Sequence, residues 1–330
     1  MSTELDSPRT LTAARGRAAQ RGLTTRQAVS DRAFRVALLG ATLLFVALIA
    51  GLFVELVHGS WESIVTFGAG FLWSSEWNPV TNHFGALPFI YGTVVSSAIA
   101  IVIAGVVGIS AAVFLAEFAP AVVARPVSFF IELLAAVPSV VFGLWGLFVL
   151  APILSQTVEP FLQRYLGFLP LFSGPIYGVG LFTAGLLLAL MIVPTVAAIA
   201  RDLIQAVPNE LREASIALGA TRWETATRVV LPSARAGIVG ACVLALGRAL
   251  GETIAATMVI GNRPAISASL FAPGYTLSSV IANEFTEATS SIYLSALLEL
   301  GLILFVVSVV VNGGARVLMW SMLRSLGRRP

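Results

Sequence analysis

The chain has 330 residues, of which 57% are hydrophobic and only 11% charged, and its mean hydropathy is +0.91. Soluble globular domains carry about 25% charged residues, so this composition excludes a soluble enzyme and a disordered protein. Cys242 is the single cysteine, which excludes an extracellular disulfide scaffold. The class that fits is an all-α polytopic membrane protein.

All 20 basic residues are arginine, and the lack of lysine excludes further classes. A P-loop requires the lysine of its GxxxxGK[ST] motif, so the chain is not itself a Walker-type ATPase. A lysine nucleophile is excluded as well. The two histidines, His58 and His83, lie far apart in the sequence with no cysteine nearby, so we expect no metal site.

Six stretches are long and apolar enough to cross a membrane as a helix, which takes about 20 residues. In chain order they are 34–57, 87–116, 127–154, 175–200, 233–260 and 291–316. The third and fourth contain Pro138 and Pro194. We expect these prolines to bend the two helices without ending them, because membrane helices tolerate proline when neighbours satisfy the freed backbone groups.

The arginines are distributed unevenly between the two sides of the membrane. With six spans, the N-terminal tail, the loops 117–126 and 201–232, and the C-terminal tail share one side. Seventeen of the 20 arginines lie there, only Arg164 and Arg263 lie on the opposite side, and Arg248 lies within a span. Short loops rich in arginine stay in the cytoplasm, so we expect both termini to be cytoplasmic.

The spans also divide the chain into regions. Residues 1–33 form an arginine-rich cytoplasmic tail, 34–318 the transmembrane domain and 319–330 a second cytoplasmic tail. The first tail has no apolar run of signal-peptide type, so we expect it to be retained. We expect it to be disordered and to set the topology; binding to anionic lipid and a mitochondrial presequence are weaker alternatives.

The predicted outer loop 58–86 is rich in tryptophan. It contains Trp61, Trp73 and Trp77, and tryptophan favours the boundary between water and lipid. We expect this loop to lie along the outer surface as a short interfacial helix. Docking of an extracytoplasmic partner on the same loop is an open alternative.

The long cytoplasmic loop 202–232 carries signals for two short helices. Pro208 starts a helix that runs from Glu210 to Leu218, and Gly219 is a natural stop beyond it. Thr221 and Glu224 have the spacing of a capping box at the start of a second helix, which Pro232 ends or from which the next helix begins. The loop is therefore predicted to be a helix, a glycine turn and a helix.

The same loop resembles the EAA loop of ABC importer permeases. That family pattern is Glu-Ala-Ala, three residues, Gly, nine residues and Ile/Leu-x-Leu-Pro, and the spacing here is the same, with Ser215 and Val229 as small departures. The resemblance implies a coupling helix that docks in a cleft of a separate ATPase subunit. An amphipathic hairpin lying on the membrane is the alternative. The residues that carry the resemblance are Glu213, Ala214, Ser215, Gly219, Leu231 and Pro232.

The fifth span contains two ionisable residues, Arg248 and Glu252. An ionisable residue inside a membrane costs about 2.5–3.5 kcal/mol on insertion scales and is by default a functional hypothesis. Four residues apart on one helix, the two can pair, with Arg248 offering planar donors to an anion and Glu252 neutralising it otherwise. A purely structural ion pair is the alternative. Gly247 and Gly251 form a GxxxG beside them and favour close helix packing.

Two further carboxylates, Glu132 and Glu299, also fall within predicted spans. Neither has an obvious partner in the sequence. A structural role and a role in a vestibule of the pathway both remain open for each.

A wider resemblance covers about residues 60–310 and points to phosphate-specific ABC importer permeases of the PstC type. The matching stretches are 71–93, 132–147, 247–262 and 267–305. The specific ones are Gly-Arg-Ala-Leu-Gly-Glu-Thr at 247–253 and Ala-Val-Pro-Ser-Val-Val, which contains Pro138 and Ser139. We expect these two residues, like Gly247 and Gly251, to serve helix packing.

The resemblance implies a transport subunit and not an enzyme. Its members form half of a translocation path, pair with a PstA-type permease and two ATPase subunits that hold ATP and Mg, and receive phosphate from an extracytoplasmic binding protein. They sit in a bacterial cell membrane, and Arg248 and Glu252 fall where the family needs a charged pair for transport. Importers of sulfate or molybdate, a secondary anion transporter and a non-transporting scaffold or sensor remain as alternatives.

Overall fold

The computed structural model of the chain describes residues 8–325. The outer ends of both predicted tails, 1–7 and 326–330, lie outside the described residues. The chain forms two compact units, Met1–Glu55 and Leu56–Pro330. The second unit holds all the predicted site residues.

The first unit is part of one long helix, α1 (Pro8–Gly59). The part of α1 from Phe34 to Gly59 forms the first span. The tail that was predicted to be disordered is helical from Pro8, and no break separates it from the span. Its richness in alanine, arginine and glutamine explains this, because all three favour helix over coil.

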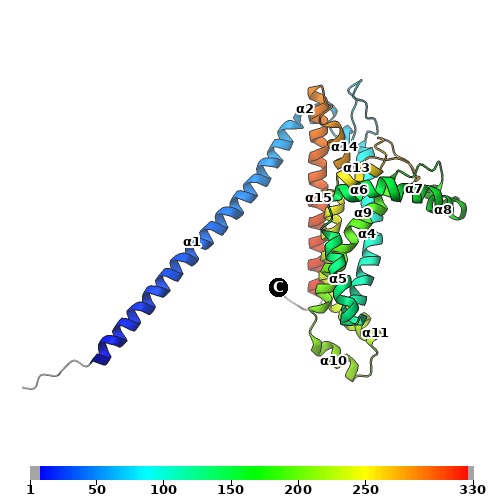
Figure 1. The fold of residues 1–330 in the computed structure, drawn as a ribbon. Coiled ribbons are helices and arrows are strands. Elements are labelled where there is room, and N and C mark those ends of the chain that lie inside the picture. Colours follow the sequence, from blue (N-terminus) through cyan, green and yellow to red (C-terminus); the bar gives the residue numbers. More distant parts are fainter. Residues whose placement is uncertain (1–7, 326–330) are drawn as a thin grey trace, which may run out of the picture. The chain divides into compact units, whose positions relative to one another are not determined.

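The centre of the second unit is a pair of closely packed helices, α4 (Leu87–Val113) and α9 (Leu181–Gln205), flanked by α12 (Leu231–Leu250) and α15 (Ser291–Ser325) (Figure 1). Small side chains such as Ala100, Ala104 and Ala189 are fully buried between the helices. Small residues let helix backbones approach closely in a membrane, where the hydrophobic effect does not drive helices together. Pro194 lies inside the unbroken helix α9.

The predicted third span, 127–154, is wrong as a single helix. The chain forms α5 (Ala121–Ala135), breaks, and resumes at Ser139, because Pro138 lacks an N–H and restricts the residue before it. A continuous helical run follows, and it lies across α4 and α9 in Figure 1. Its segments are α6 (Ser139–Trp145), η2 (Gly146–Leu150), α7 (Ala151–Ile153), η3 (Leu154–Val158) and α8 (Glu159–Leu166).

The predicted fifth span, 233–260, is displaced. The helical run begins at α11 (Arg222–Thr225), continues through a π-helical turn, η5 (Ala226–Val230), and ends with α12 at Leu250. A separate short helix, α13 (Ile254–Val259), follows after an interruption. Both ends of the span therefore lie about three turns earlier in the sequence than the apolar run alone suggests.

The remaining elements cap the two ends of the unit. On the side predicted to be outside lie α2 (Trp61–Phe67), α3 (Gly70–Trp73), η4 (Pro170–Phe172) and α14 (Leu277–Glu284). The outer loop thus holds two short helices, with Trp61 and Trp73 exposed. On the other side lie η1 (Phe114–Phe118), which extends α4, and α10 (Asn209–Ala217).

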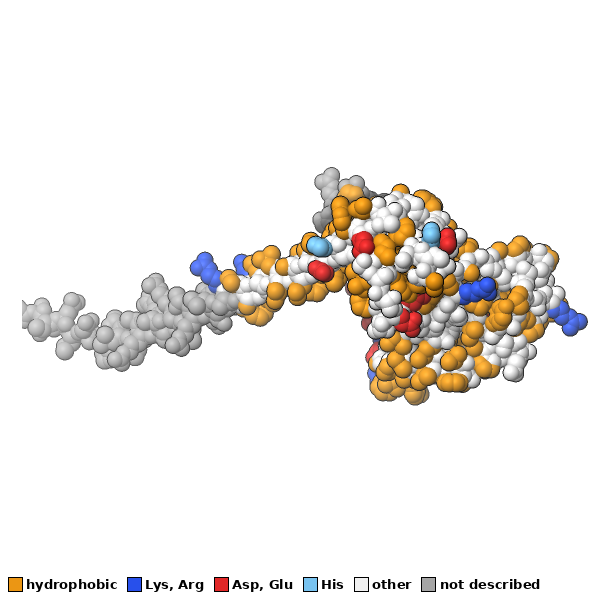
Figure 2. Space-filling view, turned by 90° about the horizontal axis from the view of Figure 1, so that it is seen from above, with side chains coloured by type: hydrophobic (Ala, Val, Ile, Leu, Met, Phe, Trp, Pro, Cys, Tyr) orange, Lys and Arg blue, Asp and Glu red, His pale blue; other side chains and the backbone are white. Residues whose placement is uncertain are grey.

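The surface of the second unit is apolar over much of its flank. Valines along α4 and α15 such as Val102, Val106 and Val310 are each about two-thirds exposed (65%, 66% and 65%). Seen from above, hydrophobic side chains gather along the rim, with few charges between them (Figure 2). Six helical runs of the described residues are long and apolar enough to span a membrane. The chain is a multi-pass, all-α membrane protein, as its composition indicates.

Candidate functional site

The loop 202–232 folds as a helix, a glycine turn and a helix, as predicted. Helix α10 ends at Ala217, and Gly219 has φ +90°, a left-handed conformation that favours glycine. The Thr221 side chain accepts a hydrogen bond from the Glu224 N–H at 3.2 Å, and the Glu224 carboxylate accepts one from the Thr221 N–H at 3.0 Å. Both halves of the predicted capping box are therefore formed.

The second helix of the loop does not stop at Pro232. The π-helical turn η5 precedes this proline, and the helix continues through it into α12. A proline near the start of a helical segment is tolerated because its missing N–H leaves little unsatisfied there. The far end of the loop is thus the first part of the fifth span itself, with Leu231 packed on the core and Pro232 exposed.

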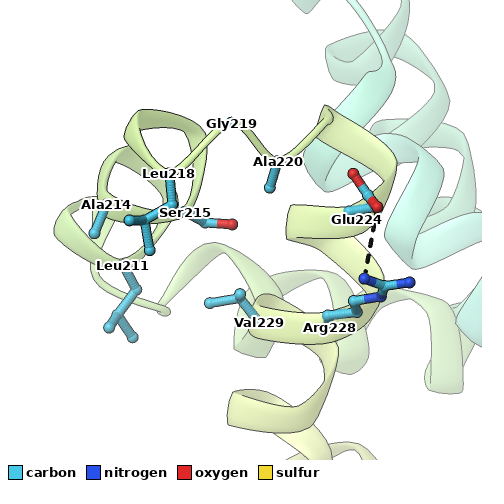
Figure 3. Close-up of a pocket in the computed structure, with 9 residues that line it drawn as sticks. All are labelled: Leu211, Ala214, Ser215, Leu218, Gly219, Ala220, Glu224, Arg228 and Val229. Carbon is cyan, nitrogen blue, oxygen red and sulfur yellow. Dashed lines mark ion pairs between the residues drawn. The ribbon is translucent and has the colours of Figure 1, made fainter.

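The two helices of the loop enclose a groove of about 540 Å³, shown in Figure 3. The Ser215 and Thr225 hydroxyls meet at 3.0 Å and tie the helices together, while Leu218 at the tip is 89% exposed. Glu213 and Ala214 face solvent. Residues lining the groove are Leu211, Ala214, Ser215, Leu218, Gly219, Ala220, Glu224, Arg228 and Val229.

A buried ion pair, not foreseen from the sequence, fastens this loop to the helices above it. Arg212 on α10 lies 2.8 Å from the Glu117 carboxylate on η1, and both side chains are largely buried, at 17% and 13% exposure. The pair joins residues 95 positions apart. The one available signal was Glu117 as an acidic residue at the end of an apolar span, facing an arginine-rich side.

Arg248 and Glu252 do not form the predicted pair. The helix ends at Leu250, so Arg248 lies in its last turn while Glu252 lies within the interruption Gly251–Thr253, and the two do not share one helix face. Within the described part of the chain, no ion pair includes either residue. Arg248 is exposed at the end of α12, and Glu252 accepts a hydrogen bond from the Ala255 N–H at 3.3 Å.

The interruption between α12 and α13 is held by hydroxyl groups from the outer segment. Buried Ser278 donates a hydrogen bond to the Glu252 carbonyl oxygen at 2.8 Å. Its hydroxyl also lies 3.2 Å from that of Thr276, which caps α14. A carbonyl released from the helix thus finds a side-chain partner, as buried backbone groups require.

The glycines singled out from the sequence do not bring helices together within this chain. A Cβ added at Gly247 would make only ordinary contact with Asn312, and at Gly251 it would meet only its own helix. Close approaches occur at other glycines, such as Gly143 on α6, where an added Cβ would lie 2.5 Å from the Met258 sulfur. Pro138 and Ser139 open this same helix. Close helix packing at Gly247 and Gly251 stays a prediction.

The two carboxylates without an obvious partner differ in their surroundings. Glu132 pairs with Arg201 at 3.1 Å and so links α5 to α9, which favours a structural role. Glu299 on α15 is only 7% exposed, and one of its oxygens has no hydrogen-bond partner among the described residues.

An aromatic cluster braces the outer end. Trp77 and Tyr293 both donate hydrogen bonds to one oxygen of Glu284, at 2.8 Å and 2.6 Å, which ties the outer loop to α14 and α15. Beside them, Tyr275 accepts a hydrogen bond from the Asn283 amide at 3.0 Å. Burial raises the pKa of Tyr275 to about 12, so its phenol stays neutral at physiological pH. Trp77 is therefore a packing residue, unlike its exposed neighbours Trp61 and Trp73.

Comparisons with known proteins agree with this architecture. Residues 104–319 match the family described as "Binding-protein-dependent transport system inner membrane component". The phosphate transport system permease protein PstC of Mesorhizobium japonicum is 49% identical over 295 residues, covering 88% of this chain and 90% of that protein. PstC of Pasteurella multocida is 47% identical over 286 residues, covering 86% and 89%.

Among solved structures, the MetNI methionine ABC transporter in an inward-facing conformation superposes with a TM-score of 0.52 at 18% identity. The match covers 71% of this chain and 94% of that one, and at this identity it shows the fold alone. The matched family segment includes the loop 202–232 and the region around Arg248. The chain therefore belongs to the binding-protein-dependent transport system inner membrane components, among the PstC-type permeases.

Proposed function

We infer that the chain is the membrane-spanning permease subunit of an ATP-driven importer of inorganic phosphate. The observation that carries this inference is similarity to phosphate permeases along most of their length, including the loop that meets an ATPase in this family. The exposed helix–turn–helix with its protruding Leu218 has the form that a docking element needs. The chain supplies half of the path, and the energy comes from another subunit.

Members of this family work with ATPase subunits and a substrate-binding protein. For this chain we assign a PstA-type permease as the second half of the path, two copies of an ATPase that hold ATP and Mg, and an extracytoplasmic phosphate-binding protein. The lack of lysine supports an ATPase supplied by a separate chain, since a Walker motif needs that residue.

The path residues are Arg248 and Glu252. Arg248 is exposed at the end of α12, and its guanidinium takes part in no ion pair among the described residues. A planar guanidinium free to donate several hydrogen bonds suits the oxygens of phosphate. Glu252 lies within the break that follows α12, and its carboxylate supplies the compensating negative charge.

The loop at 202–232 couples the permease to the ATPase through Glu213, Ala214, Ser215, Gly219, Leu231 and Pro232. Both termini are cytoplasmic, which places this loop on the side where ATP is available. The division into a tail 1–33, a membrane domain 34–318 and a tail 319–330 belongs to the same proposal. Its support is the excess of arginine on that side of the membrane.

Labelled phosphate uptake tests the function directly. Cells that lack this chain and any second phosphate importer receive the wild type, Arg248→Ala or Arg263→Ala, the last being an exposed arginine of the outer segment that serves as a matched control. We expect uptake with the wild type and the control but not with Arg248→Ala, and no competition by excess sulfate. Full competition by sulfate would assign the importer to another oxyanion.

The energy source distinguishes an ATP-driven importer from a secondary anion transporter. In vesicles with ATP trapped inside and no ion gradient, a phosphate importer of this kind accumulates phosphate. Uptake that needs a gradient and ignores ATP would identify a secondary anion transporter. Uptake unaffected in every variant, with altered phosphate signalling, would identify a sensor.

A further inference from the structure

Every nitrogen of the Arg212 guanidinium donates hydrogen bonds to groups of the protein. Its Nη2 donates to the Glu117 carboxylate at 2.8 Å and to the Ile204 carbonyl at 2.7 Å, and its Nε donates to Glu117 at 3.1 Å. Its Nη1 donates to the Asn209 side chain at 3.2 Å and to the Val207 carbonyl. Only a planar group with several N–H donors in fixed directions can serve this many acceptors; a lysine ammonium cannot.

These partners belong to three different elements. Glu117 lies on η1, the end of the second span; Ile204 lies in the last turn of α9, the fourth span; and Arg212 itself lies on the coupling helix α10. The carbonyls in the last turn of a helix lack their regular helical partners, and Arg212 adds a donor there; the Ile204 carbonyl also accepts a hydrogen bond from the Val207 N–H at 3.2 Å. One side chain thus holds three elements in one arrangement.

The Arg212–Glu117 pair lies beside a tightly packed hydrophobic cluster. The cluster is built from the cytoplasmic ends of spans two, four and five, with Ile204 fully buried. Its other members are Ala112, Val113, Ala200, Val207, Val230, Ala234 and Ile238. Well-packed interiors transmit displacement because they compress little.

A second ion pair in the same loop provides the contrast. Arg228 on η5 and Glu224 on α11 lie 3.5 Å apart, with side chains 78% and 38% exposed. Exposed ion pairs of this kind contribute little to the stability of the fold, because they lie in water, which screens the attraction between the two charges. The Arg212–Glu117 pair, by comparison, is shielded and held by several additional hydrogen bonds.

We propose that Arg212 and Glu117 form a strut that carries movement of the coupling loop into spans two and four. The inference rests on the proposed function, since it concerns how the loop drives transport. When the ATPase shifts α10, the fork of hydrogen bonds moves η1 and the end of α9 with it. Arg212 and Glu117 are positioning residues: they act on the path through the spans and not by contact with phosphate.

The test is the number of phosphates transported for each ATP hydrolysed by the complete complex in proteoliposomes. The variants are Arg212→Lys, which keeps the charge but loses the fork, and Glu117→Gln; Arg263→Gln, at an exposed arginine of the outer segment, is the control. We expect hydrolysis to continue in both strut variants while the phosphate-to-ATP ratio falls by at least about threefold, the scale of single-residue effects on coupling. The control should keep the wild-type ratio. An unchanged ratio in both strut variants would overturn the strut.

A measurement on the unaltered complex covers the case in which the variants do not assemble. Amide hydrogen exchange is followed at 114–118 and 209–217 with and without ATP. We expect protection to change in both segments together; a change confined to 209–217 overturns the proposal. Failure of the proposed function gives a different result, namely a wild-type complex that hydrolyses ATP but moves no phosphate, whatever the exchange shows.

Discussion

Arg212 and Arg248 illustrate two uses of the same side chain. The first donates to four acceptor groups and is largely buried, so its donors are already used within the fold. The second is exposed beside a helix break and takes part in no ion pair of the described residues. An arginine with unused donors near a membrane path is free to bind an anion, whereas a saturated one is not.

The shape of the Arg248 side chain, and not only its charge, should matter for transport. Arg248→Lys keeps the charge but loses the planar pair of donors. Loss of a charge-assisted hydrogen bond costs about 1.5–3 kcal/mol, so uptake at limiting phosphate should fall at least about tenfold. Arg263→Lys should leave uptake near the wild-type level. Equal uptake in both variants would limit Arg248 to a role as a point charge.

Gly219 should resist substitution because of its backbone conformation alone. An added Cβ there would meet nothing within 4 Å, but φ is +90°. A side chain in the left-handed region costs about 1–2 kcal/mol. Gly219→Ala should therefore reduce coupling of hydrolysis to transport, measured as phosphate moved per ATP. The control is Gly105→Ala, an equally open position inside α4 with ordinary helical φ; similar losses in both would contradict the conformational explanation.

At the scale of elements, the capping box decides where the second helix of the loop begins. Thr221→Ala removes one arm of the box and should destabilise the start of α11 by about 0.5–2 kcal/mol, whereas Thr221→Ser should keep it. Faster amide exchange at 222–225 in the alanine variant measures the effect. Thr227→Ala is the control, because its hydroxyl bonds only to the Trp223 carbonyl within the same helical run. Unchanged exchange would mean that tertiary packing alone holds the helix.

The coupling loop was predictable because its signals are local. Gly219, Thr221 and Glu224 act within a few residues of themselves, and the structure has each in the predicted role. The Arg212–Glu117 pair was not predictable, because it depends on how spans two and four are arranged in space. Nor was the end of α12, where Ser278, distant in sequence, takes the carbonyl of Glu252.

The spans also differ in how well the sequence predicts where they begin and end. Those bounded by simple changes in hydropathy, such as the second and the sixth, were predicted to within a few residues at most ends. The third was not, because Pro138 ends α5 where hydropathy runs on without a change. Apolar composition marks which residues avoid water, but it does not say where a helix within that run turns.

At the scale of the whole molecule, the orientation in the membrane can be tested at two exposed sites. Val80 in the outer loop is 91% exposed and Leu218 in the coupling loop is 89% exposed. In a Cys242→Ala background, Val80→Cys should react with a membrane-impermeant thiol reagent in intact cells, and Leu218→Cys only after the cells are permeabilised. Reversed labelling would place both termini outside and contradict the arginine-based topology.

The π-helical turn at Ala226–Val230 sets the direction in which the coupling loop faces. A turn of this kind carries one residue more than an α-helical turn, and one residue rotates all that follows by about 100°. The direction in which α11 faces around the axis of the fifth span therefore depends on a single inserted residue. Shortening this segment by one residue would leave α10, Gly219 and the capping box unchanged in sequence and yet turn the loop away from its present neighbours.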